Sequence, residues 1–286
     1  MAKGNRISTH CACAAAILFA AAGILPVVGC NHAVPTQAHA LPATMPVADS
    51  TSRPFVNSVG MLLAPVHPGA FVMGSPADEA GHDTDETQHK VRITRPFFLG
   101  VYQVTQKQYS AITGANPSYF RGEDFPAESR GDLPVDSVSW DDAIAFCRKL
   151  SEREGRTYRL PTEAEREYAC RAGSTGPYAG DEKLDDIGWY LVNSGDTTHP
   201  VGTLKPNAWG FYDMQGNLWE WCSDWYGPYP PGEAVDPVGP AMGTMRVLRG
   251  GAIGYDLEYA RAAFRNSYVP DSRVYHNGFR VALDAR

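Results

Sequence analysis

A tryptophan-rich stretch that also carries acidic residues, running from Asn207 to Tyr226, constrains this chain more than any other segment. Asp213 and Glu220 offer carboxylate oxygens. Because Gly216 allows a sharp bend, its main-chain carbonyl and that of Leu218 can point to the same place. Carboxylates combined with carbonyl oxygens are ligands of hard cations, and this flexible, mixed set suits Ca²⁺ better than Mg²⁺. The alternative interpretation is a tryptophan-rich core strand whose acidic residues are merely solvated.

The first 30 residues have the pattern of an export signal. A positively charged N-terminal segment precedes an apolar run from Ala12 to Val28. This run is shorter than the roughly 20 residues of a typical membrane-spanning helix. The run ends in the letters VVGC, which resemble a bacterial lipobox with Cys30 as the lipidated first residue of the mature protein. The alternative is an ordinary secretory signal that is cut later, near residues 38–40. The pattern predicts an exported protein that acyl chains anchor to a bacterial membrane, facing the periplasm or the cell surface.

Composition divides the rest of the chain into a tether and one domain. Residues 31–54 are rich in Pro, Ala, Thr and Ser and have few large apolar groups, which predicts a flexible, semi-extended tether. Residues 55–286 contain no second linker and no internal repeat, so we expect one domain. The 28 glycines and 22 prolines of the chain interrupt short apolar runs, a pattern typical of a loop-rich globule.

The charge of the chain argues against nucleic-acid binding. The formal net charge is −7, and loss of residues 1–30, which carry two basic and no acidic side chains, makes it −9. A negative surface repels the phosphate backbone, and the sequence has no basic stripe with interleaved aromatic residues. We therefore expect no nucleic-acid partner.

Two helices are predicted by their capping boxes. Ser139 and Asp142 begin the first helix, which ends at Gly155. Thr162 and Glu165 begin a second, shorter helix that stops at residue 173. Between Glu79 and His89, the segment EAGHDTDETQH is rich in residue types that bind metals, but its turn residues and polarity favour a solvated loop over a second metal site.

Motifs spread along the chain resemble the formylglycine-generating enzyme (sulfatase-modifying factor) family, from Phe55 to Arg286. They are FVMGS at 71–75, PFFLGVYQVTQKQY at 96–109, PVDSVSWDDAIAFCRKLS at 134–151, YRLPTEAEREYACRAG at 158–173, GFYDMQGNLWEW at 210–221, RVLRGG at 246–251 and NGFRVAL at 277–283. The resemblance implies an α+β, C-type-lectin-like fold that is loop-rich, with short helices and small antiparallel sheets. It also implies one or two structural calcium ions, with one calcium loop at the positions that match Asp213, Gly216, Leu218 and Glu220.

The same resemblance implies a copper site that this chain does not reproduce. In active family members, two cysteines follow a glycine pair, which is Gly250-Gly251 in this chain, at the fourth and ninth residues after it. They bind Cu(I) and activate oxygen to convert a substrate cysteine into formylglycine. Those positions are Tyr255 and Ala260 in this chain. Linear Cu(I) coordination needs two soft thiolates, so we expect neither bound copper nor this oxidation, and we assign no catalytic residue. The chain also has Arg166 where the family typically has tryptophan, and Ala-Ile after the glycine pair instead of Ser-Trp.

A remodelled groove beside the glycine pair is the candidate binding site. We expect Tyr255, Asp256, Tyr259 and Arg261 to line it, with Trp189 or Tyr190 as aromatic partners. For each of these side chains the alternative is that it packs in the core or lies on a loop.

Besides the lipidated Cys30, three cysteines remain in the mature chain. In the family, disulfides often tie the two helices to C-terminal strands, but the answering positions, Ala260 or Ala262 and Val281, are not cysteine. We therefore expect buried free thiols at Cys147, Cys170 and Cys222. A bridge between the first two depends on geometry, which the sequence leaves open.

These features leave three hypotheses for function. The first is a lipid-anchored binding or scaffold module that takes a peptide, a protein or a glycan and has lost the copper chemistry. The second is an oxidoreductase that uses copper or iron to modify exported sulfatases or other substrates. The third is an enzyme of another class, such as a hydrolase or a modifying enzyme for a peptide siderophore, which no motif in the chain supports.

Overall fold

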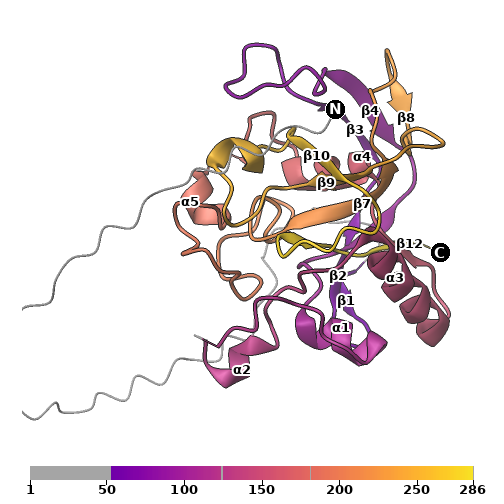
Figure 1. Ribbon diagram of the computed structural model, residues 1–286. Helices are drawn as coiled ribbons and strands as arrows, with labels where there is room; N and C mark the ends of the chain where they lie inside the picture. The colour runs from indigo at the N-terminus through magenta and orange to yellow at the C-terminus, as the bar shows by residue number, and fades with distance from the viewer. Residues whose placement is uncertain (1–52, 124, 181, 286) are drawn as a thin grey trace, which may run out of the picture. The chain divides into compact units, whose positions relative to one another are not determined.

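The computed structural model describes residues 53–123, 125–180 and 182–285. In these residues three small sheets and several short helices are joined by long loops (Figure 1). The predicted signal peptide, Cys30 and nearly all of the predicted tether lie outside the described residues. Within the part of the chain that is described, no helix is both long enough and apolar enough to cross a bilayer.

The three sheets are mostly antiparallel. Strand order in the first is β1 (Phe55–Val56), β2 (Leu62–Val66), β5 (Phe97–Gly100), β12 (Ala282–Asp284), β6 (Tyr158–Arg159). In the second it is β10 (Arg265–Tyr268), β9 (Arg246–Arg249), β7 (Trp219–Trp225), β11 (Asn277–Gly278), and in the third β3 (Gly69–Met73), β4 (His89–Ile93), β8 (Ala234–Val235). Two pairs are parallel, β11 with β7 and β4 with β8. The prediction of an α+β fold with short helices and small sheets is confirmed, with these two parallel pairs as departures from an antiparallel pattern.

The helices are α1 (Gln106–Thr113), α2 (Ala127–Arg130), α3 (Trp140–Glu154), α4 (Glu163–Arg171), α5 (Leu184–Ile187) and a 3₁₀ turn, η1 (Leu257–Ala260). Both predicted capping boxes are present. The hydroxyl of Ser139 accepts from the amide of Asp142 at the start of α3, and the hydroxyl of Thr162 accepts from the amide of Glu165 at the start of α4. Helix α4 ends one residue earlier than predicted, because Ala172 already adopts the left-handed conformation, with φ of 46°.

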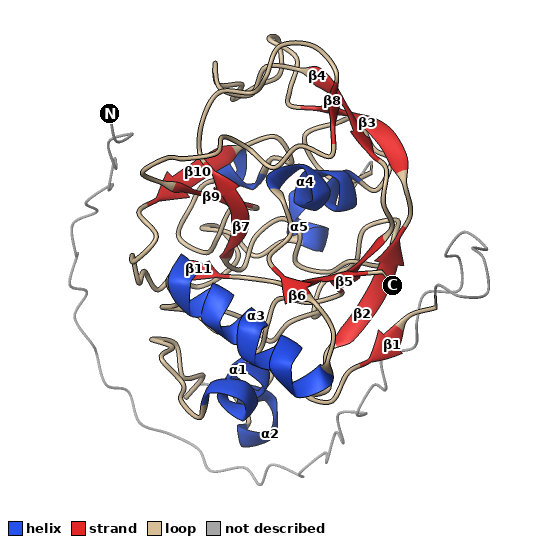
Figure 2. Cartoon of the chain, turned by 90° about the vertical axis from the view of Figure 1, so that its right-hand side faces the viewer, coloured by secondary structure: helices blue, strands red, loops and turns tan. Residues whose placement is uncertain are grey.

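Strand β7 and the loop before it contribute to two different hydrophobic clusters. The long helix α3 lies over one cluster together with α1 and β6 (Figure 2), and this cluster includes Trp219 and Trp221, neither of which is exposed to solvent. The indole of Trp221 donates to the carbonyl of Val138 over 2.9 Å. The second cluster forms around α4 and includes Met214, in the loop that leads to β7. The core strand of the alternative interpretation is therefore real, but its acidic residues are not solvated, because Glu220 is fully buried.

The cysteines of the described residues are free thiols. Cys147, Cys170 and Cys222 lie on α3, α4 and β7, and each is buried. The prediction of buried free thiols is confirmed, and the bridge between Cys147 and Cys170 that the sequence left open does not form.

Candidate functional site

The carboxylate of Glu220 is the centre of a buried cluster of charged side chains. Arg280 donates to both of its oxygens, Nε to Oε2 and Nη2 to Oε1, each over 2.7 Å. Arg166, from α4, donates from Nε to Oε2 over 3.2 Å. None of the three side chains is more than 1% exposed. Burial alone would raise the pKa of Glu220, but the two guanidinium groups hold it below its ordinary value, so the carboxylate is charged.

The amide of Gln103 lies where the predicted calcium ligands converge. Its Nε2 is 3.0 Å from the carbonyl oxygen of Leu218, 3.1 Å from Oε1 of Glu220 and 3.4 Å from the carbonyl oxygen of Gly216. Three of the four predicted ligands are thus brought together. The residue at their meeting point was missed by the sequence reasoning, since nothing distinguishes this glutamine from the other two in the same segment, Gln106 and Gln108.

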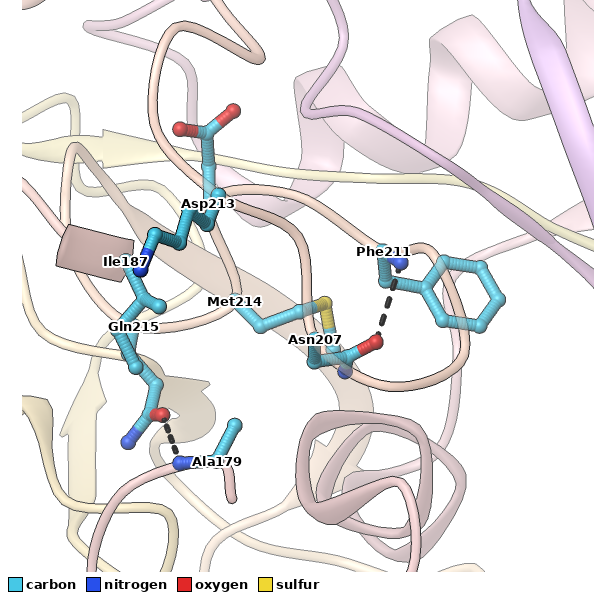
Figure 3. Close-up of a pocket in the computed structure, with 8 residues that line it drawn as sticks. Ala179, Ile187, Asn207, Phe211, Asp213, Met214 and Gln215 are labelled. Atoms are coloured by element: carbon cyan, nitrogen blue, oxygen red, sulfur yellow. Dashed lines mark hydrogen bonds between the residues drawn. The ribbon is translucent and has the colours of Figure 1, made fainter. Parts of the chain in front are cut away.

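The fourth predicted ligand, Asp213, takes a different partner. It has a φ of 54°, and its Oδ2 accepts from the amide of Gly202 over 2.8 Å. Figure 3 shows its carboxylate turned away from the small pocket beside Met214 and Gln215. Burial raises the pKa of this carboxyl to about 6.

As they lie, these residues do not fit a calcium ion. Calcium takes six to eight oxygen ligands at about 2.3–2.6 Å. Both oxygens of Glu220 already accept from guanidinium groups, the two carbonyls accept from the amide of Gln103, and Oδ2 of Asp213 accepts from Gly202. Oδ1 of Asp213 and Oε1 of Gln103 are buried without a partner, which leaves two free oxygens where calcium needs six or more. Calcium therefore stays a prediction from the sequence.

The glycine pair makes room for the charged cluster. Gly250 has a φ of 103°, and a Cβ at this position would lie 2.3 Å from Nη2 of Arg166. That nitrogen donates to the carbonyl of Met214 over 2.7 Å. A Cβ on Gly251 would lie 2.9 Å from the Cα of Ala260. The backbone of the glycine pair thus approaches its neighbours closely, and these neighbours are a guanidinium group and the 3₁₀ turn η1.

An array of rings, which we call the aromatic surface, lies beside the glycine pair. It consists of Tyr119, Phe120, Tyr255, Tyr259, Tyr275 and His276. Ring centroids of successive members are 5.3 Å apart for Tyr119 and Tyr275, 3.9 Å for Tyr275 and His276, and 5.1 Å for His276 and Tyr255. Tyr119 is 68% exposed and Tyr275 is 44% exposed, so part of the array faces solvent.

The structure places the two positions that correspond to the copper ligands at the inner end of this surface. The half-buried ring of Tyr255 packs edge-on against Trp219, with centroids 5.5 Å apart, and burial raises its pKa. Ala260 is 1% exposed and packs against the glycine pair. Tyr259 lies beside Tyr255, and Asp256 is exposed at the start of η1.

Arg261 does not line the aromatic surface, which corrects that part of the prediction. It is 2% exposed, and its guanidinium group donates to Glu79 over 2.7 Å and to both oxygens of Glu86 over 2.8 Å. These contacts also correct the prediction of a merely solvated loop between Glu79 and His89, because a buried positive charge draws the loop's acidic side chains inward.

The two suggested aromatic partners do not join the aromatic surface. Trp189 stacks on His199, with centroids 3.7 Å apart, and the hydroxyl of Tyr190 donates to Asp185. Tyr190 packs in the same small buried cluster as Ala260, and the amide of the next residue, Leu191, donates to the carbonyl of Tyr255 over 3.0 Å.

Replacement of Glu220 by glutamine tests the charged cluster. Glu220→Gln leaves two buried guanidinium groups without their counter-charge, so we expect the free energy of unfolding to fall by about 3–5 kcal/mol, measured by urea denaturation. The fall is expected to be the same with and without a chelator. Glu152→Gln, an exposed change on α3, is the matched control. A loss no larger than that of the control would contradict this account of the cluster.

A second comparison separates steric crowding from backbone strain at the glycine pair. Gly155 also has a positive φ, of 63°, but a methyl group added there would meet nothing within 4 Å beyond its neighbours in the chain. We expect Gly250→Ala to destabilise the protein by at least about 2 kcal/mol more than Gly155→Ala, because the methyl group would displace Arg166. Thermal and urea unfolding of both variants measure this difference. Equal losses would show that the contact with Arg166 is unimportant.

Comparison with known proteins identifies relatives with named functions. The formylglycine-generating enzyme of Streptomyces coelicolor is 34% identical over 281 residues, which cover 76% of this chain and 87% of that protein. The chain spans only 50% of the formylglycine-generating enzymes of Bos taurus and Mus musculus that it also matches. A Paenibacillus barcinonensis protein named chaperone protein LppX is 29% identical over 239 residues, covering 65% of this chain and 79% of that protein.

A solved structure and a family model agree with these matches. Variable protein 1 of Treponema denticola superposes with a TM-score of 0.75 at 30% identity, covering 83% of this chain and 100% of that one. The model of the sulfatase-modifying factor enzyme 1-like domain matches residues 52–285. The chain therefore belongs to the family of sulfatase-modifying factor enzyme 1-like domains, with the fold of the formylglycine-generating enzymes.

Proposed function

We propose that this chain is a binding module of its family, which takes extended segments of other polypeptides on the aromatic surface and does not oxidise cysteine with copper. The observation that carries the proposal is that the two positions expected to hold copper ligands are occupied by Tyr255, inside a packed aromatic array, and by the buried Ala260. A phenol and a methyl group cannot replace two thiolates as ligands of Cu(I).

The thiols that the described residues do contain cannot replace the missing pair of copper-binding cysteines. Cys147, Cys170 and Cys222 are buried on three different elements. Burial raises the pKa of each thiol, to about 12 for Cys147. Since the thiolate is the form that binds metal, these side chains are poor ligands where they lie.

The chemistry of the aromatic surface suits an extended polypeptide. Tyrosine rings provide a large contact area with little loss of conformational entropy, and their hydroxyl groups can bind main-chain polar groups. Leu257, two residues after Tyr255 in the chain, adds an apolar side chain that is 52% exposed. Burial lowers the pKa of His276 to about 4, so this ring is neutral at physiological pH and does not select for acidic ligands. The name of the chaperone relative from Paenibacillus supports a polypeptide as the ligand.

Binding to an unfolded protein is the direct test. With reduced, carboxymethylated α-lactalbumin as the probe, we expect Tyr119→Ser and Tyr275→Ser each to weaken binding about tenfold or more, measured by fluorescence anisotropy. Val238→Ser and Met242→Ser remove exposed apolar side chains outside the aromatic surface and are expected to leave the affinity unchanged. Equal effects of the two pairs, or no binding by the unaltered protein, would contradict the proposal.

The lost oxidation is tested with a sulfatase peptide. After incubation with the protein, copper, oxygen and a reductant, a peptide that contains C-x-P-x-R is expected to keep its thiol mass in mass spectrometry. The Streptomyces coelicolor relative serves as the positive control. A mass change to formylglycine would show a copper site that does not need the paired cysteines.

We also propose that the protein is exported and that Cys30 carries the lipid anchor, on the basis of the VVGC sequence. Expressed in bacteria, the unaltered protein is expected in the detergent phase of a Triton X-114 partition, because acyl chains transfer with the detergent. Cys30→Ser should move the protein to the aqueous phase. The same partition for both proteins would favour an ordinary secretory signal.

A further inference from the structure

Three oxygens of the loop that enters β7 face one atom, Nε2 of Gln103. They are the carbonyl oxygens of Gly216 and Leu218 and Oε1 of Glu220, at 3.4, 3.0 and 3.1 Å. This convergence is the geometry that a small cation would impose on the loop. An amide NH₂ group has two partly positive hydrogens, which three acceptors can share. It can therefore hold the three oxygens together by hydrogen bonds, as a cation would hold them by coordination.

The amide is itself held in place by burial. Gln103 is 1% exposed and lies between β5 and α1, where the neighbouring amide of Val104 donates to the carbonyl of Phe279 over 2.9 Å. The main chain therefore fixes the side chain's starting point, and the three oxygens fix the amide at its other end.

The charges of the cluster are already balanced. The carboxylate of Glu220 pairs with the guanidinium groups of Arg166 and Arg280, and the positive charge of Arg280 also acts on the carboxyl of Asp213. Arg280 is fixed further by the carbonyls of Gly100 and Tyr212, at 3.0 and 2.9 Å. A divalent ion beside Glu220 would add two positive charges next to two buried arginines, and burial makes such an excess expensive.

We propose that Gln103, Arg166 and Arg280 together replace calcium in this chain, so that the loop from Asp213 to Glu220 is held by the protein's own side chains. Gln103 fills the meeting point of the oxygens, and the two arginines supply the positive charge. Arg166 can do so because Gly250 leaves space for its guanidinium group. The loop from Asp213 to Glu220 therefore keeps its folded position without calcium.

Calcium titration of the unaltered protein tests the proposal directly. We expect the melting temperature in a chelator and in about 1 mM calcium to differ by less than about 1 °C, because an ion that does not bind the folded state cannot stabilise it. Isothermal calorimetry with calcium chloride is expected to show no binding heat. A rise in melting temperature of about 5 °C or more, together with calcium binding, would overturn the proposal.

A double variant tests whether the side chains of Gln103 and Arg166 prevent calcium from binding. Gln103→Glu combined with Arg166→Met replaces the amide by a carboxylate and removes one guanidinium group, so the cluster gains negative charge. We expect this variant to melt at a lower temperature in chelator and to regain about 5 °C or more when calcium is added. Gln88→Glu with Arg148→Met makes the same changes at exposed positions and is expected to be indifferent to calcium.

The outcomes separate the possibilities. A folded double variant that ignores calcium would overturn the role of these side chains. If the double variant does not fold with or without calcium, the melting temperature and calorimetry of the unaltered protein decide the question alone. None of these measurements depends on polypeptide binding at the aromatic surface, so failure of the proposed function would leave this inference standing.

Discussion

The fold depends on one buried carboxylate, that of Glu220. It lies on the central strand β7, and its partners come from α4 and from the chain between β11 and β12, so one group joins three distant parts of the sequence. A protein with so much loop has few long ladders of main-chain hydrogen bonds to fix the relative position of its elements. Buried ion pairs take that role, since each is strongly destabilising to break even where its net contribution to stability is small.

A second cluster of the same kind also involves α4. Glu163 accepts from Arg249 and Arg265, which belong to the neighbouring strands β9 and β10, while Glu167 accepts from Arg171 and is also paired with Arg249. Helix α4 thus carries charged side chains into both clusters. Their shared helix explains why most of α4 is buried although its sequence, EAEREYACR, is highly polar.

The aromatic surface and the charged cluster meet at the glycine pair. On one side Gly250 admits Arg166, and on the other Gly251 packs against the turn that ends at Ala260. In active relatives the corresponding turn is expected to present two thiols. Here the residues just before that turn present Tyr255 to an array of rings. This supports the proposal that the family scaffold is kept while its reactive groups are exchanged for a contact area. Family membership and catalytic activity are therefore separate statements about this protein.

The sequence by itself determined the family and the start of α3 at Ser139 and of α4 at Thr162, because these depend on local patterns and on residue identity. It left open a bridge between Cys147 and Cys170, and the tertiary structure decided that both are free. The sequence also predicted that oxygens of Gly216, Leu218 and Glu220 would converge. Only the tertiary structure decided what they converge on, since Gln103 lies more than 100 residues away in the chain and no local pattern marks it. In the same way, Arg261 has the charge and the hydrogen-bond donors typical of a binding residue, but it is paired with Glu86, 175 residues away. A charged side chain on a loop can face solvent, bind a ligand or form a buried ion pair. Which of these occurs depends on partners that come close only in the folded protein.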